Sequence, residues 1–222
     1  MLRAVLFDWN NTLVHLEWDD ARVLEGHRAA LGADDPAFTE RWRATVFGDH
    51  RYRPYAELLA DLGVEDPDAF IDAEHEVWRP AHEVLASAQA LLDSLRSLGL
   101  RTAIVANSWP DPGRVLRGDA ERFGLADRLD EMVLSEEVGA RKPDPKIFLE
   151  CCRRLDVAPS EAMHVGDSLE ADVAGAQAAG LMTVQALWFV ADTASAPVEP
   201  DVRAFTPMDV LNAARRLAFV TR

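Results

Sequence analysis

The sequence has almost no cysteine, no long apolar run and no basic segment. Cys151 and Cys152 are its only cysteines among 222 residues, and neighbours in a chain are poorly placed to bridge each other, which is typical of a reducing compartment. No apolar run reaches the ~20 residues of a membrane span, and the run that ends before Asp8 is shorter than a signal peptide. We therefore expect a cytoplasmic protein that has no membrane partner and keeps two buried thiols.

Positive charge is scarce. Lys and Arg number 23 against 38 Asp and Glu, which gives a formal net charge of -15 at pH 7. A field of this sign repels nucleic acid, so we expect no nucleic-acid partner. It also repels phosphate esters, so any phosphate chemistry needs a bound cation and a well-placed Lys or Arg.

Apolar residues make up an ordinary 49% of the chain, and a chain of this length can bury a large core. They gather in short continuous runs, which are typical of parallel strands covered on both faces. The runs lie at residues 4–7, 103–106, 132–134 and 163–165, and a fifth lies at 182–187.

Helical patterns separate these runs. The clearest begins at Leu85, has apolar residues at steps of three and four, and stops at Gly99, a typical residue just past a helix end. A loop at 195–200 precedes a final helix at about 208–219. The alternation predicts an α/β fold with a Rossmann-like, doubly wound, mostly parallel sheet.

Residues 15–80 interrupt this alternation. They are rich in helix formers and Trp, are punctuated by Gly and Pro, and contain no convincing strand. We expect about four short helices here, inserted as an α-helical cap. The predicted division is therefore a core of residues 1–14 and 81–222 and a cap of residues 15–80.

Polar residues follow the predicted strands at the edge of the sheet where such folds bind ligands. They belong to four motifs, whose order and spacing resemble those of the haloacid dehalogenase superfamily over nearly the whole predicted core. The motifs are F-D-W-N-N-T-L at 7–13, V-A-N-S at 105–108, G-A-R-K-P-D-P-K-I-F at 139–148 and H-V-G-D-S-L-E-A-D at 164–172.

The resemblance implies a hydrolase in which Asp8 is the nucleophile and forms an aspartyl-phosphate with a small phosphorylated substrate. Carboxylates of Asp8 and Asp167, with the backbone carbonyl of Asn10, are hard oxygen ligands suited to Mg²⁺. Asp172 is expected either on the ion or beside it. Lys142 would neutralise charge between the nucleophile and the transferred group. It would thereby offset the repulsion between the acidic protein and a phosphate ester.

Substrate contacts are expected from the same strand ends and from the cap. Thr12 and Asn107 would hydrogen-bond phosphoryl oxygens, as in the family, and Ser108 or backbone N–H groups would replace a hydroxyl missing at Ala106. His15, near the expected hinge, is a candidate proton donor. The cap candidates are Trp18, Arg41, Trp42, Arg43, Arg51, Tyr52 and Arg53.

Asn10 departs from the pattern, because family phosphatases carry a second Asp there as general acid and base. An amide cannot donate and retrieve a proton, so a factor of about 10²–10⁴ in rate would be missing. Either the leaving group needs little protonation, or the residue is a substitution that traps the phosphoenzyme, or the protein is a degenerate binder of phosphate and metal. A 2-haloacid dehalogenase stays open as another alternative, since halide leaves without a proton. We expect a monomer or a homodimer.

Overall fold

The computed structural model describes residues 1–48, 53–108, 112–191 and 198–218, and it contains two compact units. The α/β unit comprises Met1–His15, Val84–Asn107 and Arg117–Arg222. The helical unit comprises Leu16–Glu83 and Ser108–Leu116, and the second of these segments was not part of the predicted cap. None of the described helices is both long enough and apolar enough to cross a membrane.

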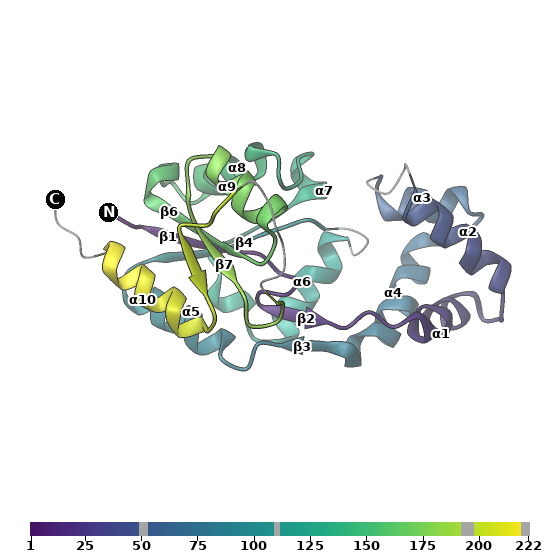
Figure 1. Cartoon of the computed structure of the whole chain (residues 1–222). Coiled ribbons are helices and arrows are strands. Elements are labelled where there is room, and N and C mark those ends of the chain that lie inside the picture. The colour runs from purple at the N-terminus through teal and green to yellow at the C-terminus, as the bar shows by residue number, and fades with distance from the viewer. Residues whose placement is uncertain (49–52, 109–111, 192–197, 219–222) are drawn as a thin grey trace. The chain divides into compact units, whose positions relative to one another are not determined.

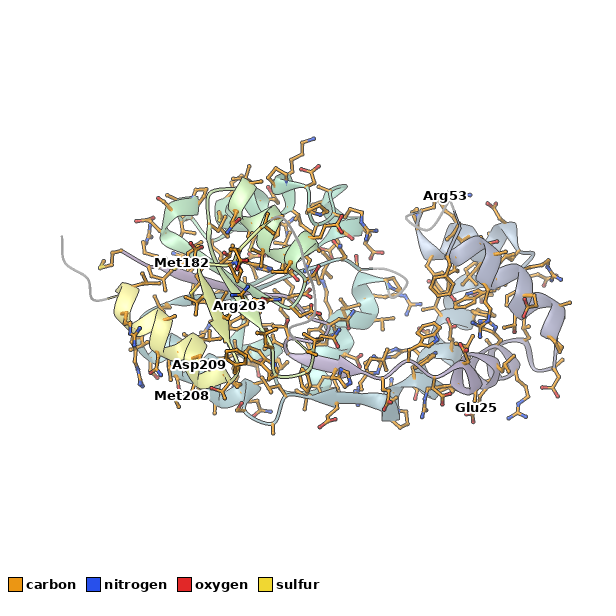
Figure 2. All side chains as sticks on the ribbon, in the orientation of Figure 1. Glu25, Arg53, Met182, Arg203, Met208 and Asp209 are labelled. Carbon is orange, nitrogen blue, oxygen red and sulfur yellow. The ribbon has the colours of Figure 1, made fainter. Side chains whose placement is uncertain are left out.

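The α/β unit is built on one parallel sheet, which confirms the predicted fold class. The strand order is β5-β4-β1-β6-β7-β8, and the apolar runs of the sequence form its first five strands along the chain. β8 was not predicted, because it has only three residues and lies at an edge of the sheet. Met182 in β7 and Arg203 in β8 are labelled in Figure 2 and mark this side of the sheet. The strands are β1 (Ala4–Phe7), β4 (Arg101–Ala106), β5 (Glu131–Leu134), β6 (Ala162–Gly166), β7 (Met182–Ala186) and β8 (Val202–Ala204).

Helices cover both faces of this sheet (Figure 1). α8 and α9 lie on one face and α5 and α10 on the other, where α5 ends just before Gly99, as predicted, with a left-handed φ of 78° at the glycine. The helices are α5 (Ala88–Ser97), α6 (Gly113–Arg122), α7 (Ser135–Val138), α8 (Pro145–Arg154), α9 (Gly175–Ala178) and α10 (Pro207–Ala218), with short helical turns η2 (Ala126–Arg128), η3 (Pro159–Glu161) and η4 (Leu169–Ala174).

The core under α8 contains both cysteines. Cys151 and Cys152 are free thiols in contact with apolar side chains of the sheet, which confirms that they are buried and unbridged. Burial raises the pKa of both thiols, that of Cys152 to about 11. Neither thiol is therefore ionised at neutral pH.

The sheet has a topological switch point beside β1. From β1 the chain proceeds to β4 and β5 on one side, and β6, β7 and β8 then extend the sheet on the other side. In open α/β sheets, ligands bind at the carboxyl ends of the strands at such a point. Asp8 follows β1 and Asp167 follows β6, so both emerge at this place.

The helical unit contains four helices among its described residues before Glu83, as expected. Three begin at an Asp whose carboxylate accepts a hydrogen bond from the first turn, and Pro follows the Asp in two of them, as is common at helix starts. Inside the unit, Trp42 donates to the hydroxyl of Tyr55, which donates to Glu74, both at 2.8 Å. The helices are α1 (Asp20–Leu31), α2 (Pro36–Val46), α3 (Tyr55–Asp61) and α4 (Pro67–Trp78), followed by η1 (Arg79–Ala81).

Two short strands, β2 (Val14–Leu16) and β3 (His82–Val84), pair with each other in a separate sheet. The expectation of no strand from residue 15 onward is therefore wrong at its first two residues. Three-residue strands carry too little alternation to be recognised from sequence.

Candidate active site

A tight turn holds Asp8 at the end of β1. The backbone N–H of Asp8 donates to Val165 at 2.8 Å, which extends the parallel ladder by one residue. Immediately afterwards the carbonyl of Trp9 accepts from both Leu13 and Val14 at 3.0 Å. The chain therefore reverses directly after Asp8, and the Asp8 carboxyl stays at the sheet edge.

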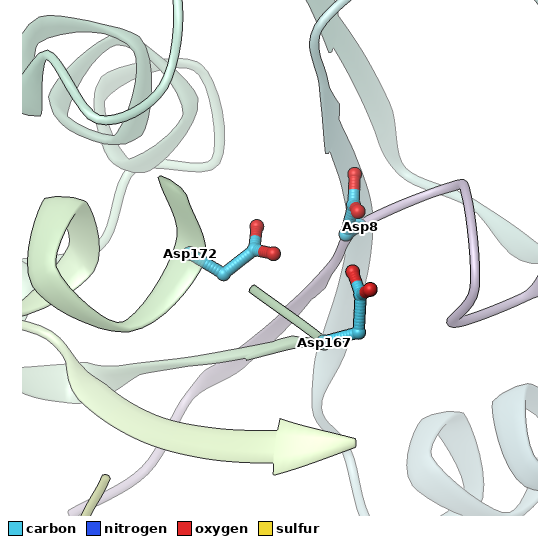
Figure 3. A group of neighbouring side chains, drawn as sticks. All are labelled: Asp8, Asp167 and Asp172. Atoms are coloured by element: carbon cyan, nitrogen blue, oxygen red, sulfur yellow. The ribbon is translucent and has the colours of Figure 1, made fainter. Parts of the chain in front are cut away.

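Three carboxyl groups meet at this edge, those of Asp8, Asp167 and Asp172 (Figure 3). They come from the end of β1, the residue after β6 and the turn η4. Each offers an oxygen, and these oxygens all lie within 4.8 Å of one another. Residues separated by more than 150 positions in the sequence thus form one cluster, as the strand ends predicted.

Asp172 is held in place by local backbone geometry. Its Oδ2 accepts from the N–H of Ser168 at 3.0 Å, while the Ser168 hydroxyl accepts from Ala171 at 3.0 Å, so the two ends of the turn cap each other. A Cβ at Gly166 would collide with the Asp172 carboxyl. The glycine of the fourth motif is therefore required for Asp172 to approach the sheet.

Lys142 bridges two of the carboxylates. Its ammonium lies 2.5 Å from Oδ1 of Asp8 and 2.6 Å from Oδ1 of Asp172, and its side chain is only 3% exposed. Asn107 fixes the backbone of Lys142, since its Oδ1 accepts from the Lys142 N–H at 2.8 Å and its Nδ2 donates to the Lys142 carbonyl at 3.1 Å. The ammonium is thus aimed at Asp8 by a residue that follows β4.

Burial and crowding of like charge set the ionisation of the cluster. Burial, with a further contribution from Asp172, raises the pKa of Asp8 to about 7, although Lys142 opposes this. Burial also raises the pKa of Asp167 to about 6. For Asp172, Lys142 and His164 outweigh burial and hold the pKa well below its usual value. Burial lowers the pKa of Lys142, but the two carboxylates beside it outweigh this, so the ammonium stays charged.

The cluster suits a hard divalent cation. Its three carboxyl groups face a single ammonium, so the fully ionised site has excess negative charge in a buried place, which is unfavourable without a further cation. All of the available donors are oxygens, which Mg²⁺ and Ca²⁺ prefer. Asp8 and Asp167 are the better candidate ligands, because both oxygens of Asp172 already accept hydrogen bonds.

Three other predicted site residues are Thr12, Asn10 and Ser108. Thr12 is fully buried, and within the described part of the chain its hydroxyl has no hydrogen-bond partner. Asn10 is exposed beside it, and Ser108 is buried in the helical unit. Their contacts with phosphate and metal stay predictions.

Several of the cap candidates have structural partners in the helical unit. Trp42 is buried against Tyr55, Arg43 pairs with Asp20, and Arg53 pairs with Glu57 and Asp61. Trp18 is 50% exposed. Arg51 and Tyr52 lie outside the described residues.

Two residues that lie against the cluster received no role from the sequence. His164 in β6 lies 2.9 Å from Oδ1 of Asp172 through its Nε2, and burial lowers its pKa, so it is a neutral donor. In the sequence, a histidine inside an otherwise apolar strand indicates that His164 has a polar partner. The side chain of Asn11 lies 3.4 Å from Oδ2 of Asp167, and no spacing rule indicates this contact.

Known proteins are similar to this chain in sequence and in fold. The model of the haloacid dehalogenase-like hydrolases matches residues 2–180. The chain belongs to this family. A glyceraldehyde 3-phosphate phosphatase of Methanopyrus kandleri is 31% identical over 83% of this chain and 84% of its own length. An (S)-2-haloacid dehalogenase of a Pseudomonas species is 29% identical over the same shares.

The fold of the haloacid dehalogenase-like hydrolases is also found in solved structures. The crystal structure of a HAD phosphatase from Thermococcus onnurineus superposes with a TM-score of 0.73 at 24% identity, covering 96% of this chain and 97% of that one. At this identity the likeness concerns the fold. The assignment to the HAD-like hydrolases rests on the family model that matches residues 2–180.

Proposed function

We propose that the protein is a Mg²⁺-dependent phosphatase that acts on a small phosphorylated metabolite through an aspartyl-phosphate at Asp8. The observation that carries this proposal is the position of Asp8, at the switch point of the sheet and 2.5 Å from the Lys142 ammonium. The relative from Methanopyrus kandleri, a phosphatase of a small sugar phosphate by its name, supports the same reaction class.

Asp8 acts as the nucleophile in this proposal. One of its carboxylate oxygens forms a bond to phosphorus while the bond between phosphorus and the leaving oxygen breaks, and water then hydrolyses the acyl phosphate. Lys142 offsets negative charge on the transferred group, and Asn107 keeps it aimed. When bound, Mg²⁺ supplies positive charge at the phosphoryl oxygens. Asp8, Asp167 and the Asn10 carbonyl would hold the ion, and Asp172 would act beside it by holding Lys142.

Asn10 restricts the substrates. No carboxylic acid stands two residues after the nucleophile to protonate a departing alkoxide or to activate water. Leaving groups that are stable as anions, such as carboxylates and phenolates, escape the loss of the acid but not the loss of the base that activates water. We therefore propose acyl or aryl phosphates, or similarly activated esters, as the better substrates, with the helical unit as the cap that supplies substrate contacts.

The test is steady-state hydrolysis of acetyl phosphate and p-nitrophenyl phosphate with and without Mg²⁺. We expect slow, Mg²⁺-dependent turnover, a gain on the order of 10² in Asn10→Asp, and no turnover in Asp8→Ala. Absence of turnover in both the unaltered chain and Asn10→Asp would refute the phosphatase proposal. A degenerate binder would give that result while still binding phosphate and Mg²⁺.

Dehalogenation is the second candidate, and Asn10 is the observation that favours it. The Asp8 carboxylate would displace halide from carbon and form an ester that water hydrolyses, and the departing halide needs no proton. The dehalogenase from Pseudomonas is 29% identical to the chain. Against this candidate, the half-buried Asp167 and the buried Asp172 form an acidic pair that is costly without a cation. Release of chloride from 2-chloropropionate without Mg²⁺ would favour it.

A further inference from the structure

Asn11 has an unusual backbone conformation for a residue with a side chain. Its φ is 54°, in the left-handed region that glycine adopts without cost, although Asn tolerates it better than most residues do. The turn uses only its backbone, because the N–H of Asn11 donates to the Val14 carbonyl at 2.7 Å. A glycine would satisfy the turn equally well, so the turn itself does not explain the amide side chain.

The side chain makes two contacts in opposite directions. Its Oδ1 lies 2.8 Å from Nδ1 of His15, and its Nδ2 lies 3.4 Å from Oδ2 of Asp167. A carboxylate only accepts hydrogen bonds, so the NH₂ group must face Asp167 and the oxygen must face His15. His15 therefore carries its proton on Nδ1 and donates to Asn11. The three residues form a directed chain of hydrogen bonds that ends on a candidate metal ligand.

The outer end of this chain is held by a ring contact. The imidazole of His15, in β2, stacks on Phe189 with centroids 5.0 Å apart and an interplanar angle of 12°. Phe189 follows β7, the strand whose Gln185 side chain donates to the Asp167 carbonyl at 3.4 Å. Asp167 is thus approached by one contact to its carboxylate and another to its backbone. Asp172, by contrast, receives three hydrogen bonds of its own, from Lys142, His164 and Ser168.

We propose that Asn11 and His15 are positioning residues that orient the Asp167 carboxylate toward the bound cation. The inference rests on the proposed Mg²⁺-dependent function. Hydrogen bonds to a ligating carboxylate fix its rotamer before the ion arrives, and loss of such a partner typically weakens metal binding by about 10- to 100-fold. Asn11 lies beside the cluster and does not itself touch the reacting atoms.

The chain offers a matched control for the backbone. Asp156 is the other non-glycine residue with a left-handed φ among the described residues, at 52°, and it lies exposed at the end of α8. Asn11→Gly and Asp156→Gly therefore make the same backbone change, the first inside the site and the second away from it. Neither substitution disfavours the native φ, so both variants are expected to fold.

The experiment is calorimetric titration of Mg²⁺ into substrate-free protein, with Mn²⁺ paramagnetic resonance as a second readout. Asn11→Gly should bind Mg²⁺ about tenfold more weakly, and Asp156→Gly should bind it like the unaltered chain. His15→Phe keeps a ring on Phe189 but removes the N–H, and it should weaken binding in the same direction by a smaller factor.

The outcomes separate the two proposals. If the unaltered chain binds Mg²⁺ and Asn11→Gly binds it equally well, the positioning role is overturned while the proposed function stands. If the unaltered chain binds neither Mg²⁺ nor Mn²⁺, the Mg²⁺-dependent function is overturned, and the positioning role with it. Weaker binding in Asp156→Gly as well would assign the effect to the backbone and overturn the role of the amide.

Discussion

Metal binding should release protons, because the candidate ligands are partly protonated near neutral pH in the metal-free protein. Burial raises the pKa of Asp167 to about 6 and that of Asp8 to about 7, whereas Mg²⁺ requires both as carboxylates. At pH 6, roughly half a proton should leave Asp167 on binding, and a further share should leave Asp8. At pH 8.5, almost none should leave either group.

The sign follows from the direction of these shifts. A carboxyl group whose pKa is raised in the folded state stabilises the metal-free fold at pH values below its ordinary pKa of 3.8. This stabilisation is lost as the pH rises through about 6 to 7. Bound Mg²⁺ offsets the repulsion among the ionised carboxylates, which grows as the pH rises. The affinity of the protein for Mg²⁺ and the rise in Tm that Mg²⁺ produces should therefore both increase from pH 5.5 to 8.

Titration calorimetry in buffers of different ionisation enthalpy measures the released protons directly. Asp167→Asn, which leaves Asp8 and Lys142 in place, is the control and should release fewer protons as well as bind more weakly. An Mg²⁺ affinity that is independent of pH over this range, with no proton release at pH 6, would show that the carboxyl groups are already ionised and that the reasoning from burial is wrong.

Two substitutions test the packing around Asp172. His164→Leu removes a buried hydrogen-bond donor to the Asp172 carboxylate. It should lower the free energy of unfolding in urea by about 1–3 kcal/mol and lower kcat about tenfold. His164→Gln can still donate and should recover part of both losses, and equal losses in the two variants would exclude the hydrogen bond as the cause. Gly166→Ala places a methyl group against the Asp172 carboxyl and should lower stability by about 1–3 kcal/mol and abolish most activity, while an unchanged Tm would mean that η4 moves freely.

The sheet could be predicted from sequence because its strands are continuous apolar runs that are buried on both faces. β1 lies at the predicted residues 4–7. β8 and β2 could not be predicted in this way, since three residues carry no readable period and their pairing depends on distant partners.

The candidate site shows the same division. Asp8 and Asp167 follow strands that the topology makes neighbours, so their meeting follows from chain order alone. The contacts of His164 and Asn11 depend on side-chain directions and on one left-handed residue, neither of which spacing encodes. The predicted division into core and cap, and the phosphate contacts of Thr12, Asn107 and Ser108, stay predictions.

The two buried thiols in α8 have a practical consequence for labelling experiments. With Cys151 and Cys152 buried and un-ionised, neither should react quickly with maleimide or peroxide while the protein is folded. A cysteine introduced on an exposed position of the helical unit would then be the fast-reacting thiol of the chain. A fluorophore could be attached there without replacing the native cysteines, and slow labelling of the remaining two would report global unfolding in the same sample.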